Sequence, residues 1–221
     1  MRQKIRGAVL REGQSLRGVT FGDLLLDDCR TRLAEDFDAR PVIEDVSVAS
    51  LRVKSCSLSG ALLRNVTVGG LTGDQGSLFI NGCEFHNVML SGAIGDLTIQ
   101  TFVTARTPEE LAMYEHRVRE ADQGDDMGLD IRGVEGDLSI RGYSAHRIRI
   151  DPTFQAVVPR ERAVAGVWDD IDFGESTLEI ALQDVVRRGW KDTILSANKR
   201  SRHFEEDVAI ITELRQRGIA L

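Results

Sequence analysis

Residues 46–68 place apolar or small side chains in pairs. The members of a pair stand two residues apart, and each pair follows the last by five. The pairs are Val46 and Val48, Leu51 and Val53, Cys56 and Leu58, Ala61 and Leu63, and Val66 and Val68. An α-helix would scatter these pairs around its axis, and a straight strand would send successive pairs to opposite faces. One buried surface results only if the backbone bends once in every five residues. Four such sides would close a coil of about 20 residues, with turns stacked about 4.8 Å apart.

This stacking predicts that Val46 and Val48 lie directly beneath Val66 and Val68. Polar and small residues between the pairs would occupy outward corners, where glycine, serine and asparagine adopt turn conformations at little cost. These residues are Ser50, Lys54, Ser55, Ser59, Gly60 and Asn65. The near-copies GDLTI (95–99) and GDLSI (136–140) indicate an internal repeat. The pattern therefore predicts an all-β solenoid over residues 1–150.

Three segments carry a resemblance to a known family. In KSCSL (54–58), SGALL (59–63) and NGCEF (81–85), a small residue precedes Leu or Phe by two positions. This pattern resembles the pentapeptide-repeat family, and the resemblance implies a right-handed, quadrilateral β-helix. The chain departs from the family by placing Val at several central positions and by lacking the usual acidic or amide residue before the centre. GDLTI and GDLSI also resemble, more weakly, the β-helix of the cytoskeletal bactofilins.

Residues 107–123 interrupt the period with helix signals. Thr107 can serve as N-cap, Pro108 suits the first helical position, and Glu110 completes a capping box. The apolar stripe of this helix consists of Leu111, Tyr114 and Val118. We therefore expect a helical insertion at about residues 105–130, with its stripe against the coil.

The insertion lies in an acidic stretch. Between residues 107 and 137 there are ten acidic residues and three arginines. One hypothesis is a solvated excursion, and the other is an acidic arm that binds a basic partner. The candidate contact residues of the arm are Glu109, Glu110, Glu115, Asp122, Asp125 and Asp126.

The period of five ends near residue 150, and residues 151–221 are predicted to be mainly helical. Residues 174–189 form one expected helix, with Ser176 and Glu179 as a capping box and Gly189 as its stop. Residues 202–218 form the second. The inward stripes are Leu178, Leu182 and Val185 in the first helix, and Phe204, Val208, Ile211 and Leu214 in the second. Such helices would cap the last turn of a solenoid. The alternative is a homodimer contact, because pentapeptide-repeat proteins often pair through their C-terminal ends.

Residues 187–203 are basic, and Asp192 is the only acidic residue among them. This segment could bind phosphate or an acidic partner, or it could be a solvated face. The candidate contact residues are Arg187, Arg188, Lys199, Arg200 and Arg202. Apart from this segment, the net charge of −7 argues against nucleic acid as a partner.

Composition agrees with a narrow, repetitive interior, because aromatic residues are only 5% of a chain that is 42% hydrophobic. No apolar run reaches the roughly 20 residues that a membrane span needs, and the N-terminus lacks the apolar region of a signal peptide. The three cysteines include no close pair, which fits free thiols and a cytoplasmic location.

Motifs for chemistry are scarce. Cys29, Cys56 and Cys83 all take the small inward position of a unit, so we expect inert thiols. The four histidines have no metal-ligand spacing, and no phosphate-binding glycine motif is present. We therefore predict no metal and no cofactor. The acidic cluster WDDIDFGE (168–175) could serve a glycan-cleaving enzyme, but it lies outside the repeat.

These observations favour a non-enzymatic β-solenoid that binds or scaffolds another protein. It would act through its outward faces, the acidic segment 107–137 and the C-terminal helices. The first alternative comes from the family resemblance, which includes DNA-mimicking modulators of type II topoisomerases. A β-helix enzyme that acts on glycans is the second alternative, and filament assembly of the bactofilin kind is a further one.

Overall fold

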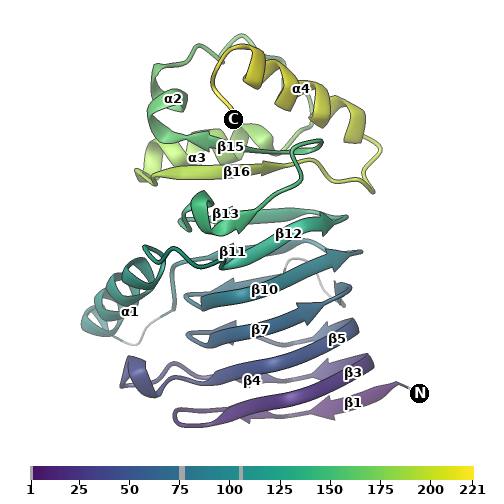
Figure 1. Cartoon of the computed structure of the whole chain (residues 1–221), viewed down its shortest axis with the longest axis vertical. Helices are drawn as coiled ribbons and strands as arrows, with labels where there is room; N and C mark the ends of the chain where they lie inside the picture. Colours follow the sequence, from purple (N-terminus) through teal and green to yellow (C-terminus); the bar gives the residue numbers. More distant parts are fainter. Residues whose placement is uncertain (1, 75–77, 105–106) are drawn as a thin grey trace.

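The computed structural model describes residues 2–74, 78–104 and 107–221. Up to about residue 150 the described chain is a stack of parallel strands (Figure 1). The strands of the stack are β1 (Gln3–Arg6), β2 (Val9–Leu10), β3 (Ser15–Asp27), β4 (Arg30–Thr31), β5 (Val42–Lys54), β6 (Leu58–Ser59), β7 (Leu62–Val68), β8 (Leu71–Gly73), β9 (Leu78–Asn81), β10 (Glu84–Gly92), β11 (Leu97–Gln100), β12 (Leu129–Val134), β13 (Leu138–Arg141) and β14 (Ile148–Arg149).

The strands form three parallel sheets around one apolar interior. The largest has the order β1-β3-β5-β7-β10-β12-β14, with β8 paired to β5. The second has the order β13-β11-β9-β6, and β2 pairs with β4 in the third. The chain is thus mostly strand and arranged in parallel sheets, in agreement with the β-rich fold predicted from the period.

The predicted stacking of valines is confirmed. Val46 pairs with Val66 and Val48 pairs with Val68 across β5 and β7. Val88 of β10 extends the first row. These two pairs of valines are at most 8% exposed. Each inward residue therefore packs on its counterpart one pass later.

The length of a pass is not constant. The connection from Val46 to its partner Val66 has the predicted length. Two others are much longer: Val19 pairs with Val46, and Val88 pairs with Leu129. The additional chain holds the helix η1 (Phe37–Ala39) in the first case and α1 (Pro108–Ala121) in the second. The interior register persists because the additional chain leaves the stack and returns to it.

Several predicted corners are confirmed by their backbone. Ser55, Gly60 and Asn65 all have φ between 52° and 61°, the left-handed region in which Gly and Asn are favoured. The prediction was wrong for Ser50, Lys54 and Ser59, which lie within β5 and β6. The backbone thus turns at fewer positions than one in every five.

The predicted inserted helix is confirmed as α1. The hydroxyl of Thr107 accepts a hydrogen bond from the amide of Glu110 at 3.1 Å, and Pro108 is the first helical residue. Tyr114 and Val118 are buried and Leu111 packs beside them. The helix therefore lies against the side of the stack with its apolar stripe inward (Figure 1).

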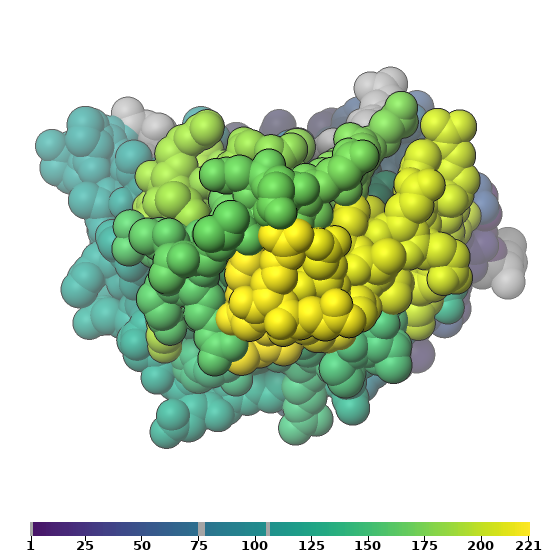
Figure 2. Space-filling model, turned by 90° about the horizontal axis from the view of Figure 1, so that it is seen from above, coloured from purple at the N-terminus to yellow at the C-terminus, as the bar shows by residue number. Residues whose placement is uncertain are grey.

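Residues after 150 form a second apolar cluster at the end of the stack opposite the N-terminus (Figure 1). Figure 2 looks down on this end, where the residues after 150, in green to yellow, face the viewer and cover earlier parts of the chain. This C-terminal unit contains β15 (Gln155–Pro159), α2 (Arg160–Ala165), α3 (Leu178–Arg188), β16 (Asp192–Ser196) and α4 (Phe204–Gln216). The antiparallel pair β15–β16 was not predicted.

Both predicted C-terminal helices are present, and Gly189 and Gly218 follow them with left-handed φ values of 71° and 72°. The predicted capping box of α3 is wrong. The hydroxyl of Ser176 accepts a hydrogen bond from the amide of Leu178 at 3.2 Å, and the N-cap position belongs to Thr177. No helix in the described part of the chain is long and apolar enough to cross a membrane.

Candidate functional site

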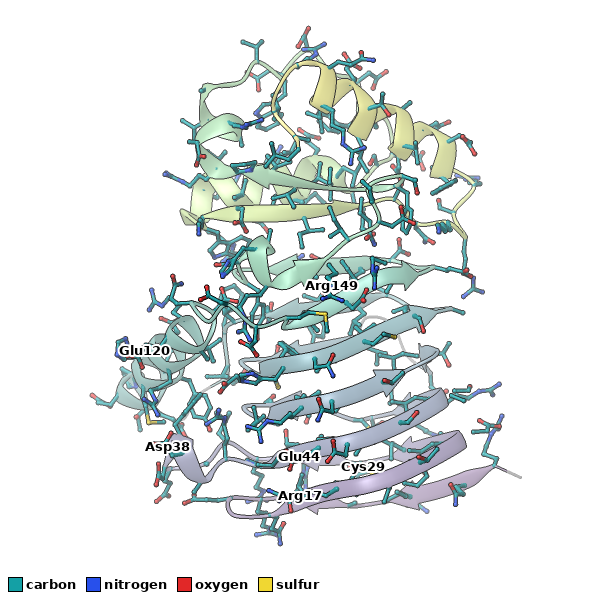
Figure 3. All side chains as sticks on the ribbon, viewed as in Figure 1. Arg17, Cys29, Asp38, Glu44, Glu120 and Arg149 are labelled. Atoms are coloured by element: carbon teal, nitrogen blue, oxygen red, sulfur yellow. The ribbon has the colours of Figure 1, made fainter. Side chains whose placement is uncertain are left out.

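The acidic segment is not a free arm, because α1 is fastened to the stack. The hydroxyl of Tyr114 makes two hydrogen bonds with the backbone of Ala34, and its ring meets Phe37 edge to face at 5.3 Å. Arg117 pairs with Asp38 of η1. Figure 3 places Asp38 and Glu120 at this junction.

The predicted acidic contact residues divide into two groups. Asp122 is buried and accepts a hydrogen bond from the amide of Ser144 at 2.7 Å, and burial raises its pKa. Asp126 binds His86 and Arg147. The others lie on the outer side: Glu109 and Asp125 are exposed, and Glu110 and Glu115 are half-buried. Two of the six candidates therefore have evident structural roles.

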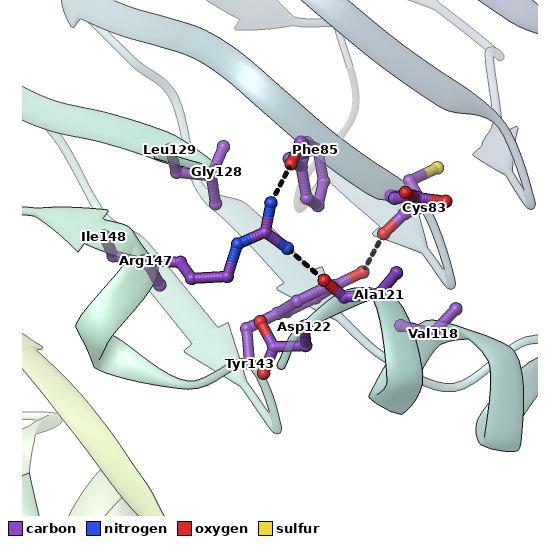
Figure 4. A pocket seen from close by; sticks show the side chains of 11 residues that line it. Cys83, Phe85, Val118, Ala121, Asp122, Gly128, Leu129, Tyr143, Arg147 and Ile148 are labelled. Carbon is purple, nitrogen blue, oxygen red and sulfur yellow. Dashed lines mark hydrogen bonds between the residues drawn. The ribbon is translucent and has the colours of Figure 1, made fainter. Parts of the chain in front are cut away.

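Arg147 joins α1 to the stack (Figure 4). Its guanidinium donates hydrogen bonds to the carbonyls of Phe85 at 2.9 Å, Ala121 at 2.7 Å and Asp126 at 3.0 Å. Beside it the hydroxyl of Tyr143 donates to the carbonyl of Cys83 at 2.7 Å. The cavity between these residues, of about 10 Å³, has room for at most one water molecule, so the cluster serves to join α1 to the stack rather than to hold a ligand.

A charged group borders this cluster. The imidazole of His86 lies 2.5 Å from a carboxylate oxygen of Glu84 on one side and 2.5 Å from one of Asp126 on the other. The hydrogen bond with Glu84 is the main cause that raises the pKa of His86. Arg40 also pairs with Glu84 and stacks on Phe37, 4.0 Å from the ring centroid. Sequence spacing missed this group because its members come from different passes of the chain.

The outer face of the largest sheet carries a row of alternating charge. Arg17 pairs with Glu44 at 3.3 Å, and Glu44 pairs with Arg64 at 2.9 Å (Figure 3). A DNA-mimicking surface would present like charges in succession, as the phosphate backbone does. In this row the single carboxylate is flanked by an arginine on each side, so negative charges do not follow one another.

The basic segment 187–203 is divided by β16. Arg187 and Arg188 precede this five-residue strand, and Lys199, Arg200 and Arg202 follow it. The two groups therefore lie about 17 Å apart along the strand. Three of the five residues have local partners: Arg188 pairs with Asp184, Lys199 lies over the ring of Phe154 and Arg202 pairs with Glu175.

The carboxylates of residues 168–175 do not converge. Asp170 pairs with Arg217 at 2.5 Å, and this contact lowers the pKa of Asp170. Asp172 accepts a hydrogen bond from the amide of Gly174 at 2.9 Å. A glycosidase needs one carboxyl group whose pKa is raised so that it can donate a proton. The contact of Asp170 with Arg217 lowers its pKa, which is the opposite of what a proton donor needs.

All three cysteines are free, as predicted, and they face the interior. Cys29 and Cys83 are buried, and Cys56 is half-buried. Burial raises the pKa of Cys83 to about 12, which makes its thiol unreactive near neutral pH. Among the residues that the structure describes, no group of three or more potential ligands is placed to hold a metal ion.

A central cavity of about 360 Å³ runs through the stack. Its lining is mainly apolar and extends from Ile5 near the N-terminus to Leu129 of β12. The central valines of the period, such as Val48 and Val68, line it. The family resemblance placed Leu or Phe at such positions, so the valine substitutions were the sequence signal for this cavity.

The size of the central cavity is unusual for a protein interior, which normally has few voids larger than a water molecule. The apolar side chains around it lack partner atoms on their inner side, so a ligand that filled the cavity would supply those contacts. The cavity is thus a candidate binding site.

A second candidate surface lies on the C-terminal unit. Val164, Val167, Ile180 and Leu221 are between 53% and 72% exposed. The segment that carries the two valines lies against the C-terminus, because Arg217 donates a hydrogen bond to the carbonyl of Val167 at 3.1 Å. Exposed apolar side chains therefore lie on the C-terminal unit, and two of them belong to a segment that contacts the end of α4.

Comparison of the chain with protein-family models, with curated proteins and with solved structures found no match.

Proposed function

We propose that this chain is a non-enzymatic binding or scaffold protein that acts through protein–protein contacts and pairs with a second copy through its C-terminal unit. Its framework would be a right-handed β-solenoid with a C-terminal helical cap. The resemblance to pentapeptide-repeat proteins supports this framework, as do the parallel sheets and the stacked valines.

The exposed apolar side chains of the C-terminal unit carry this proposal. Val167 is 72% exposed, Val164 57% and Leu221 55%. They come from two segments in contact, since Arg162 donates a hydrogen bond to the carbonyl of Gly218 at 3.2 Å. A patch of apolar side chains on adjoining segments is the usual core of a protein interface. Dimerisation would bury it.

Analytical ultracentrifugation over a micromolar concentration range tests the pairing. We expect the wild-type chain to form a dimer and the double variant Val164→Asp, Val167→Asp to remain a monomer. Met89→Asp is the matched control, because Met89 is 41% exposed on β10, away from the C-terminal unit. It should leave the dimer intact. A wild-type protein that stays monomeric throughout the range would refute the pairing.

A further inference from the structure

The central cavity is open toward the N-terminal end of the stack. Leu97, Ile99 and Leu129 line its far end and are at most 1% exposed. Phe21 on the second pass is half-buried, and Leu16 is 36% exposed. No described element lies beyond β1 and β3 at this end (Figure 1). A ligand can therefore enter from the N-terminal end and meets a closed wall at β11 and β12.

The shape of the cavity selects a long, thin ligand. The lining spans six successive passes of the chain, from Ile5 to Leu129. Neighbouring passes are about 4.8 Å apart, so the cavity is about 24 Å long. A volume of 360 Å³ spread over that length leaves a narrow channel. An unbranched aliphatic chain fits it, whereas a fused-ring molecule is too wide.

The chemistry of the entrance points to a negative head group. Arg30 is the one charged residue among those that line the cavity, and it is exposed on β4, one pass from the open end. No ion pair involves Arg30 within the described ranges. Residues 2–32 contain seven Lys or Arg and four Asp or Glu, although the whole chain carries −7. A carboxylate at the entrance would meet a positive end of an otherwise acidic molecule.

We propose that the central cavity is a binding site for a single unbranched fatty acid. The tail lies along the rows of aliphatic side chains, and the carboxylate pairs with Arg30 at the N-terminal end. This site is independent of the proposed C-terminal pairing, because the two lie at opposite ends of the molecule (Figure 1).

Binding is measured with delipidated full-length protein, by displacement of a fluorescent fatty-acid analogue and by native mass spectrometry. We expect palmitate to bind in a 1:1 complex with each chain. In the series laurate, myristate, palmitate, each added methylene group should lower the Kd about fourfold, because each buries more apolar surface. Cholesterol should not displace the probe.

Two variants with matched controls locate the ligand. Val68→Phe fills the cavity from β7 and should abolish binding while the protein stays folded, and Thr67→Phe, on the exposed side of the same strand, should bind normally. Arg30→Gln should weaken binding of palmitate about tenfold or more without affecting hexadecanol, which lacks the charge. Arg52→Gln removes an equal charge from an exposed position outside the lining and should have no effect.

Thiol labelling provides a separate readout. Cys56 lines the cavity, so bound palmitate should slow its alkylation by N-ethylmaleimide. Cys83 lies outside the lining and is fully buried, so it should stay unlabelled with and without palmitate.

The proposal is overturned if palmitate does not bind, or if Val68→Phe binds it as well as the wild type does. It is equally overturned if a second copy covers the entrance. In that case Leu16→Asp would convert a dimer into a monomer, and palmitate would bind neither form.

Discussion

The hydroxyl of Tyr114 accepts a hydrogen bond from the amide of Ala34 at 2.8 Å and donates one to the carbonyl of the same residue at 3.3 Å. One side chain of α1 thus satisfies both backbone groups of a residue on a much earlier pass of the chain. Tyr114 and Ala34 are both fully buried. Removal of the hydroxyl would leave a donor and an acceptor without a partner in an apolar setting.

The variant Tyr114→Phe should therefore lower the free energy of unfolding by about 1–3 kcal/mol, because unsatisfied buried backbone groups keep their full desolvation cost. Denaturant unfolding followed by circular dichroism measures this change. His116→Phe, on the exposed side of the same helix, is the control and should change stability by about 0.5 kcal/mol or less. Equal effects of both substitutions would contradict the role given to the hydroxyl.

Arg147 should be the most sensitive charged position of the stack. Arg147→Met removes one hydrogen-bond donor from each of three backbone carbonyls and a partner of Asp126, so we expect a loss of about 3 kcal/mol or more. Thermal and denaturant unfolding measure the loss. Arg149→Met is the control on the neighbouring strand β14, where the side chain is exposed (Figure 3). A variant of Arg147 as stable as the control would exclude a structural role for the cluster.

The charged group around His86 predicts a pH-dependent stability. The hydrogen bond with Glu84 raises the pKa of His86 against the effect of burial, and Asp126 adds to the increase. The pKa of His86 is thus higher in the folded than in the unfolded protein. Its contribution to stability is fully present at a pH below the unfolded pKa of about 6.5, and it is lost as the pH rises through the folded pKa.

Glu84 and Asp126 respond in the opposite sense. Burial raises the pKa of each, but His86 and the neighbouring arginines outweigh it, so both pKa values are lowered. Their contribution to stability is present at a pH above the unfolded pKa of about 4, and it is lost as the pH falls through the lower folded pKa.

The stability difference between the wild type and His86→Gln should thus be greatest between about pH 5 and pH 6.5, at about 1–2 kcal/mol, and should shrink at higher pH. Chemical unfolding at a series of pH values measures both proteins. Parallel stability curves across the whole range would show that His86 does not titrate in this setting.

Asn65 combines a strained backbone with a side-chain ladder. Its φ is 52°. Its side-chain NH₂ group donates a hydrogen bond to the carboxylate of Asp45 at 2.9 Å, and its side-chain carbonyl accepts one from the side-chain NH₂ group of Asn87 at 3.0 Å. Asn65→Ala should cost about 1–2 kcal/mol, because alanine tolerates the left-handed conformation poorly and cannot bridge the ladder. Asn65→Gly should restore only the part of the lost stability that comes from the left-handed backbone, because glycine adopts that conformation freely. The unfolding midpoint should be highest with Asn, intermediate with Gly and lowest with Ala at this position. A more stable Ala variant would refute the argument from backbone strain.

The local period was enough to predict the rows of valine, because Val46 and Val66 report their spacing directly in the sequence. The junction of Phe37 with Tyr114 could not be predicted, because it joins segments with no common period. Arg147 likewise stands in a polar stretch, and only the return of the chain after α1 surrounds it with carbonyls.

The candidate sites, too, could be predicted from the sequence only in part. The acidic and basic segments are real features of the sequence, but packing places Asp122 inside the molecule and β16 between the arginines. The central cavity depends on how completely valines fill a space whose width the strands set together, and no single residue encodes that width.

The helix-sized excursion between β11 and β12 has a consequence for chain entropy. Because of it, the path from Val88 to its partner Leu129 is much longer than the path from Val66 to Val88. Closure entropy grows with the logarithm of loop length, so even a doubling of the path adds only about 0.6 kcal/mol. Leu97 and Leu138 still meet in register across the excursion. This edge of the stack is therefore a natural insertion point, where a new segment can be added without any change to the interior.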